Sequence, residues 1–264
     1  MFSLLRADMR RILRRHGGFY GFAIVIVALC LVMGVAVELL SRLGAEAGVD
    51  TGITPYASPV DCVVGMLGDL LALVICLSAV RVCWIDKRNG YDRTIVSSCG
   101  KRTYYHEKIL FALVLTVVFA LFALAATSVT GLLVRGISGL DSPLVFVEWF
   151  APTVLVAWTC ACLSMAGLWL TGSQILGIVL AFFLTNGMIA GAIGMAVGGV
   201  NADVAQVYYA VCEWLPNAAV TLSANAVNGA FVFAQEGLAR MAVPTVACLA
   251  LTFVCVGVLR KRDL

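Results

Sequence analysis

The sequence predicts an all-α integral membrane protein with six transmembrane helices, and three observations lead to that prediction. Of the 264 residues, 62% are hydrophobic and only 12% are charged, whereas soluble domains carry roughly 25% charged residues. Apolar stretches long enough to cross a bilayer recur along the whole chain. Lys and Arg gather between alternate stretches rather than evenly. We therefore expect one transmembrane domain over residues 1–264.

The six expected spans follow from bilayer thickness. A span needs about 20 apolar residues, because a helix rises about 1.5 Å per residue through about 30 Å of hydrocarbon. The stretches that meet this need lie at about 19–40, 60–84, 109–134, 149–170, 175–199 and 241–259. No charge occurs from Trp149 to Ala202, which is too long for one helix. The polar, glycine-bearing cluster Thr171 to Gln174 is the expected turn between the fourth and fifth spans.

The basic residues predict the orientation. Fifteen of the 18 Lys and Arg residues precede the first span, lie at or between the second and third, or follow the last. Because Lys and Arg concentrate in cytoplasmic segments, this bias puts both termini in the cytoplasm. The expected location is the cytoplasmic (inner) membrane.

The segment 205–237, on the expected outer face, allows two interpretations. Residues 218–234 are free of charge and could form a seventh span, but Asn217, Asn225 and Asn228 are costly in lipid. We favour short re-entrant or interfacial helices, with Pro216 and Gly229 as breaks.

The N-terminus predicts an amphipathic elbow helix over residues 2–16. Phe2, Leu5 and Met9 recur at helical spacing opposite Arg6 and Arg10. Such a helix lies at the membrane surface and attracts anionic headgroups. It is either a topological anchor or a lever that moves with the bundle.

The loop 85–108 is the largest expected cytoplasmic feature. Its basic residues satisfy the orientation rule, but that rule needs neither Asp92 nor Glu107 nor the pair Tyr104 and Tyr105. Mixed charge with aromatic side chains is typical of a docking surface for a protein. A merely solvated loop is the competing interpretation.

The order of these parts resembles the permease subunits of type-two ABC exporters. That family has an elbow helix, a coupling loop after the second span, a short turn between spans four and five, and partly inserted helices before the last span. The coupling-loop pattern is matched by Asp86, Gly90, Thr94, Ser97, Ser98, Lys101, Arg102 and Lys108. The resemblance covers the whole chain as architecture.

The resemblance implies a function and partners. A separate cytoplasmic ABC ATPase would dock on Asp86, Gly90, Thr94, Lys101, Arg102 and Lys108, and on the turn Thr171, Gly172 and Ser173. This chain would hold no cofactor, and ATP and magnesium would belong to the ATPase. A second copy or a homologous permease would complete the path. The cargo would be a drug, an antimicrobial peptide, as in lantibiotic self-immunity, or a lipid-like molecule.

Other function classes find little support in the sequence. There is no G-x-x-x-x-G-K-[ST] loop to cradle nucleotide phosphates, and no nucleophile with a histidine base or H-E-x-x-H metal site. We therefore expect that the chain is not an enzyme. Its basic loops flank the membrane, so lipid rather than nucleic acid is the expected anionic partner. The alternative function is a non-transporting six-helix anchor, sensor or assembly protein.

A few residues inside the expected spans are candidates of their own. Asp69 either lines a path or reaches outer-face water, and Asn186 either lines a path or bonds to a neighbouring helix. Small residues at G-x-x-x-G spacing predict close helix packing; they are Gly187, Gly191, Gly194 and Gly198. Most of the ten cysteines lie in apolar runs and are expected to pack as small hydrophobes. Cys62 and Cys212 alone are placed so that a bridge would be possible.

Overall fold

The computed structural model describes residues 5–10, 19–46, 58–134, 137, 139–187, 195–196, 202–224 and 235–261, and within them every regular element is helical. The helices are α2 (Phe19–Glu46), α3 (Pro59–Met66), α4 (Leu70–Arg88), α5 (Tyr91–Cys99), α6 (Lys101–Val134), α7 (Pro143–Thr171), α8 (Gln174–Thr185), α10 (Ala202–Cys212), α11 (Pro216–Ala224) and α12 (Gln235–Lys261). Residues 5–10 form a further short helical segment.

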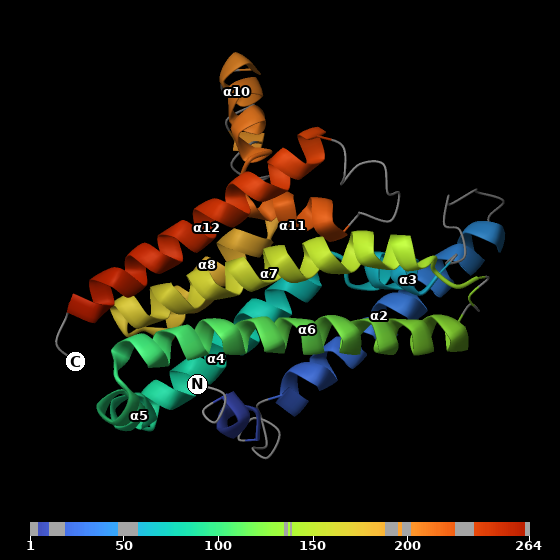
Figure 1. Cartoon of the computed structure of the whole chain (residues 1–264). Helices are drawn as coiled ribbons and strands as arrows, with labels where there is room; N and C mark the ends of the chain where they lie inside the picture. Colours follow the sequence, from blue (N-terminus) through green and yellow to red (C-terminus); the bar gives the residue numbers. More distant parts are fainter. Residues whose placement is uncertain are drawn as a thin grey trace.

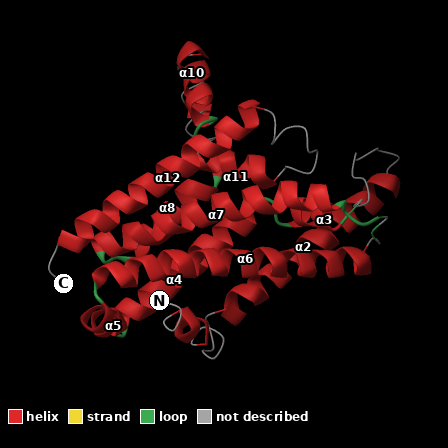
Figure 2. Ribbon diagram, viewed as in Figure 1, coloured by secondary structure: helices red, strands yellow, loops and turns green. Residues whose placement is uncertain are grey.

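The long helices run side by side with α7 at the centre of the bundle (Figure 1). α7 contacts α4, α6, α8, α11 and α12. α5 and the end of α12 lie at one end of the bundle, and α3 lies toward the other (Figure 1). Short loops join the described helices at the α5 end, as Figure 2 shows. We refer below to this end, with α5 and the α7–α8 turn, as the α5 end.

Four helices are long and apolar enough to cross a membrane: 19–44 of α2, α6, α7 and 237–259 of α12. They correspond to the first, third, fourth and last of the expected spans. The all-α membrane fold is therefore supported, with four such helices in the described part of the chain, or five if the bent pair α3 and α4 counts as one span.

The expected span 60–84 is not one straight helix. α3 and α4 meet at a bend of 74°. The break lies at residues 67–69, where Gly68 has a φ of +45°. This left-handed backbone is accessible to glycine at little cost and does not continue a right-handed helix. The span predicted at about 60–84 therefore corresponds to a bent pair of helices, with Asp69 at the break.

The expected fifth span, 175–199, is described only in part. α8 has 12 residues, about 18 Å of helix, which is shorter than the hydrocarbon core. The remainder of that span falls largely outside the described residues, including Gly191, Gly194 and Gly198.

A turn is present at the predicted position Thr171 to Gln174, between α7 and α8. α7 ends at Thr171, Gly172 takes a φ of +71°, and α8 begins at Gln174. A left-handed glycine is the commonest way to end a helix. At its other end α7 starts with Ser142, whose hydroxyl accepts a hydrogen bond from the Val145 N–H at 3.3 Å.

Close packing around α7 depends on glycines that the sequence analysis did not single out. A Cβ atom on Gly177 of α8 would lie 2.8 Å from Val80 Cγ1 and 3.3 Å from the Ser164 carbonyl oxygen. The absent side chain therefore lets α4, α7 and α8 meet. Gly187 is the one described member of the predicted glycine set, and a Cβ atom there would lie 3.6 Å from Asn217 Nδ2, an ordinary van der Waals distance.

The cysteines pack as expected. All ten are free, and seven are buried: Cys30, Cys62, Cys76, Cys83, Cys160, Cys162 and Cys248. Cys62 packs against Gly131 of α6, where a Cβ atom would lie 2.7 Å from the sulfur. Cys62 and Cys212 form no bridge.

Short helices occupy the described part of 205–237. Pro216 begins α11, as the predicted break requires, while Gly229 lies outside the described residues. α11 packs against α7, α8 and α12. α10 instead stands away from the bundle (Figure 1), and the Glu213–Arg240 ion pair at 3.1 Å links its C-terminal end to α12.

Candidate functional site

The predicted coupling loop contains a short helix, α5, that lies across the end of α4 and α6 (Figure 1). It is bounded by Gly90 with a φ of +70° and Gly100 with a φ of +82°. No residue of α5 is buried. Ile95 and Val96 pack partly against the core, while Ser97 and Ser98 are exposed. α5 therefore rests on the bundle with one face and presents a polar face outward.

The predicted docking residues separate into two groups. Thr94 and Arg102 are exposed, and Gly90 and Lys101 are half-buried. Asp86 and Lys108 are buried to 1% and 0% exposure. The expectation that these two side chains meet a partner directly is wrong, because each satisfies the other's charge inside the protein.

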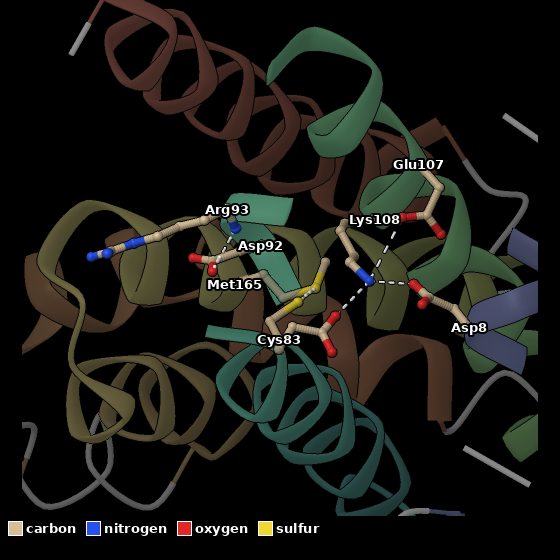
Figure 3. Close-up of polar contacts among 8 residues, drawn as sticks. Asp8, Cys83, Asp92, Arg93, Glu107, Lys108 and Met165 are labelled. Atoms are coloured by element: carbon tan, nitrogen blue, oxygen red, sulfur yellow. Dashed lines mark hydrogen bonds and ion pairs between the residues drawn. The ribbon is translucent and has the colours of Figure 1, made fainter. Parts of the chain in front are cut away.

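Lys108 is the centre of a buried cluster of four ionisable side chains (Figure 3). Its Nζ atom lies 2.7 Å from Asp86 Oδ2 and 3.7 Å from Glu107 Oε2, and it donates a hydrogen bond to Asp8. The ring of Tyr104 lies 5.5 Å from the same ammonium. We call Asp8, Asp86, Glu107 and Lys108 the lysine cluster.

The lysine cluster joins three parts of the chain. Asp8 comes from the helical segment 5–10, Asp86 from the end of α4, and Lys108 from the start of α6. In segment 5–10, Leu5 and Met9 pack against the core while Arg6 is exposed. The described part of the predicted elbow helix is thus amphipathic as expected, and a buried ion pair also holds it to the bundle.

Glu107 and Lys108 lie beyond the apolar part of α6. That helix has 34 residues, about 51 Å, which is longer than the roughly 30 Å hydrocarbon core. All of the charged residues of α6 lie among its first eight positions. The part of the helix that exceeds the hydrocarbon thickness is therefore at the α5 end. Burial, reinforced by Asp8 and Asp86 and opposed by Lys108, raises the pKa of Glu107 to about 7. Burial acts to lower the pKa of Lys108, but the acidic neighbours, Asp86 first, raise it above its ordinary value.

The predicted second docking turn lies beside the start of the coupling loop. A Cβ atom on Gly172 would lie 2.8 Å from Lys87 Nζ, so the turn between α7 and α8 contacts the end of α4. Thr171 is exposed and Ser173 is half-buried. The two predicted docking segments thus occupy neighbouring positions, although Lys87 and Gly172 are 85 positions apart in sequence.

A small cavity lies where α4, α5, α6 and α7 meet. Its volume is about 30 Å³, and its lining includes Lys87, Asp92, Val96, Tyr105 and Trp169. The rings of Tyr105 and Trp169 lie 5.0 Å apart. This contact joins α6 to the end of α7, and both rings line the cavity together with Val96 of α5.

Asp69 and Asn186 lie away from the α5 end. Asp69 is half-buried at the break between α3 and α4, where its Oδ2 accepts a hydrogen bond from Thr221 Oγ1 at 2.9 Å. Asn186 ends α8 and is also half-buried. The structure does not join these two predicted path residues to the lysine cluster.

Sequence reasoning singled out the segment 85–108 but did not single out Asp8, which lies against Lys108. Its signal was available, because Asp8 is the only acidic residue among the first 16, which contain five arginines. Among the described residues, no group of three His, Cys, Asp or Glu side chains is placed to hold a metal ion. No protein-family model, curated protein or solved structure matches the chain significantly.

Proposed function

We propose that the chain is the permease subunit of an ATP-driven ABC exporter of the second type, acting with a separate cytoplasmic ATPase. The observation that carries this proposal is α5: a short helix with no buried residue, supported on the ends of α4 and α6 and close to the turn at Gly172. A surface of this kind suits a soluble partner that must transmit force to several helices at once.

The contacts under α5 give the transmission a physical basis. Ile95 and Val96 pack against the core, and the Tyr105–Trp169 contact lies below them. A partner that closed on nucleotide binding would push α5, and α5 would push α6 and α7. A ligand shifts a conformational equilibrium only through a difference in its contacts with the two states, and α5 offers the surface for that difference.

The proposal includes the topology. Six spans with both termini in the cytoplasm would put α5 in the cytoplasm of a cell with the chain in its inner membrane. A second copy or a homologous permease would complete the path, in contact with membrane lipid. The exposed apolar side chains of α2 and α12, such as Ile24, Val32, Val246 and Val254, provide surface for both kinds of neighbour.

The expected substrate is amphipathic or apolar. The described part of the membrane helices carries few polar groups apart from hydroxyls that bond to their own backbone, as Thr116 and Thr127 do. Such walls favour a drug, an antimicrobial peptide or a lipid-like molecule over a sugar polymer.

Co-purification from the cells that make the protein tests the proposal. The intact chain should retain an ATP-binding-cassette ATPase and ATP hydrolysis. Arg93→Glu, which reverses an exposed charge on α5, should weaken both. Lys261→Glu, an equivalent change at the exposed end of α12, should leave both unchanged. If no such ATPase is retained, the result favours the alternative function, a non-transporting membrane anchor, sensor or assembly protein.

A further inference from the structure

An apolar groove lies on the outside of the bundle, where α2 runs beside α6 (Figure 1). Tyr20, Ile24, Val27 and Leu31 recur along one face of α2, and they line the groove together with Phe122 of α6. Its volume is about 500 Å³, within the roughly 300–1,000 Å³ typical of sites for small ligands. We call it the α2–α6 groove, and it is large enough to hold a ligand.

The chemistry of the α2–α6 groove selects an occupant made of hydrocarbon. Apart from the phenol of Tyr20, the side chains that line it are apolar, and Ile24 among them is 68% exposed. Both α2 and α6 are long and apolar enough to cross a membrane. The groove therefore faces the hydrocarbon of the bilayer when these helices cross it, and its occupant must present an apolar surface.

The length of the α2–α6 groove matches one leaflet of a bilayer. Two of its lining residues, Phe19 and Leu31, are 12 positions apart, which is about 18 Å of helix. One leaflet contributes about 15 Å, half of the hydrocarbon core. Phe19 is the first residue of α2, and α2 begins at its end nearer to α5 (Figure 1). A phospholipid of the leaflet on that side could therefore lay one acyl chain along the groove.

Basic side chains lie at the end of the groove where α2 begins. Phe19 also lines a second, smaller hollow, and Arg81 of α4 forms part of its wall. Arg81 is exposed. A guanidinium has five N–H donors in a fork that fits phosphate oxygens, so it can hold a headgroup phosphate in addition to contacts within the protein. Segment 5–10 adds the exposed Arg6 and Arg10 at the same end of the bundle (Figure 1).

Phenylalanine rings fix the shape of the groove at this basic end. The ring of Phe19 stacks on Phe119 at 5.1 Å and meets Phe122 edge-on at 6.2 Å. Phe22 meets Phe119 edge-on at 6.5 Å. Offset-stacked and edge-to-face pairs are the favoured arrangements of aromatic rings. The groove is therefore already formed where it meets the hollow at Arg81.

We propose that the α2–α6 groove binds one anionic phospholipid, with an acyl chain along Phe19 to Leu31 and the headgroup phosphate at Arg81. Burial of apolar surface gives little selectivity inside a bilayer, because lipid tails are as apolar as the protein. The guanidinium therefore supplies the preference and the groove fixes the position. A helix of a second copy could also fill an apolar groove, but an anionic lipid carries the hydrocarbon and the anion on one molecule. The inference does not depend on the proposed transport function.

Native mass spectrometry of the full chain tests this site. The chain is released from nanodiscs that hold equal amounts of phosphatidylglycerol and phosphatidylcholine with the same acyl chains, and the lipid that stays bound is counted. The wild type should prefer phosphatidylglycerol about fivefold, the size expected for one basic residue beside an anionic lipid. Arg81→Gln should remove most of that preference. Lys261→Gln removes an exposed charge at the same end of the bundle (Figure 1) and should keep it.

A second pair of variants tests the groove itself, even if Arg81→Gln folds poorly. Ala28→Phe fills the groove from a small, exposed lining residue, so the amount of bound phosphatidylglycerol should fall several-fold. Ala247→Phe makes the same change at an exposed position of α12 and should retain the lipid. The site is overturned if the wild type shows no headgroup preference, or if the two variants retain equal amounts of phosphatidylglycerol. Loss of a dimer in Ala28→Phe, with lipid retention unchanged, would assign the groove to a second copy instead.

Discussion

Replacing Lys108 by Met should destabilise the protein strongly, because it removes the buried ammonium that lies against the carboxyl groups of Asp8, Asp86 and Glu107. Methionine is similar in length to lysine, so packing against Tyr104 and Phe111 is largely kept. Without the ammonium, Asp8 and Asp86 each lose a buried ion-pair partner. Removing one partner of a buried ion pair costs roughly 3–5 kcal/mol, because the other charge is left buried without its partner.

Thermal unfolding in nanodiscs measures this loss. For a protein of this size, about 4 kcal/mol lowers the midpoint of unfolding by roughly 10 °C. Carboxyl groups take up protons more readily as the pH falls, so the deficit of Lys108→Met should shrink toward acidic pH. Lys261→Met removes an exposed lysine at the end of α12 and should change stability by less than about 0.5 kcal/mol.

Two outcomes would refute this reasoning. One is a midpoint for Lys108→Met equal to that of Lys261→Met, which would mean that the ammonium balances no buried charge. The other is a large deficit that does not depend on pH, which would point to lost packing rather than to the carboxyl groups.

Three further predictions concern packing, the hydrogen bonds and the break in the membrane helices. Gly177→Ala should lower stability by about 1–2 kcal/mol, because a Cβ atom there meets Val80 and a carbonyl oxygen. Gly257→Ala is the control: its Cβ atom meets nothing within 4 Å, so it should be neutral or stabilising by up to about 1 kcal/mol. Thermal unfolding compares the two variants. Trp158→Phe removes the 2.9 Å hydrogen bond from its indole to a carbonyl of α6 and should cost about 1 kcal/mol in the same assay. Asp69→Asn should alter export without lowering the yield of folded protein if Asp69 lines the path, and a loss of yield alone would assign it a structural role.

The architecture at the α5 end was largely predictable from sequence. Charge placement located the segment 85–108 that contains α5. Thr171 to Gln174 marked the turn because no other polar, glycine-bearing cluster lies near the middle of that apolar run. The bend at Gly68 was not predictable in the same way. One glycine inside an apolar run is common in membrane helices, and only the three-dimensional packing shows that this one adopts a positive φ.

The chemistry of the site was less predictable than its location. Asp86 and Lys108 are 22 positions apart and Asp8 is 100 positions from Lys108, so no local pattern joins them. Charged residues in a loop are usually solvated, and sequence alone therefore favoured exposure for side chains that are in fact buried. The packing glycine Gly177 was missed for a related reason, since it lies outside any G-x-x-x-G repeat.

The most direct test of the proposed function is photo-crosslinking from α5 in intact cells. A photoreactive residue at the exposed position Ser98 should capture an ATP-binding-cassette ATPase. The same residue at Leu140, which is 91% exposed between α6 and α7 at the far end of the bundle, should not. Capture of that ATPase from Ser98 alone is the predicted result. Absence of the ATPase from the Ser98 products, in cells where the chain is folded and membrane-inserted, would contradict the account.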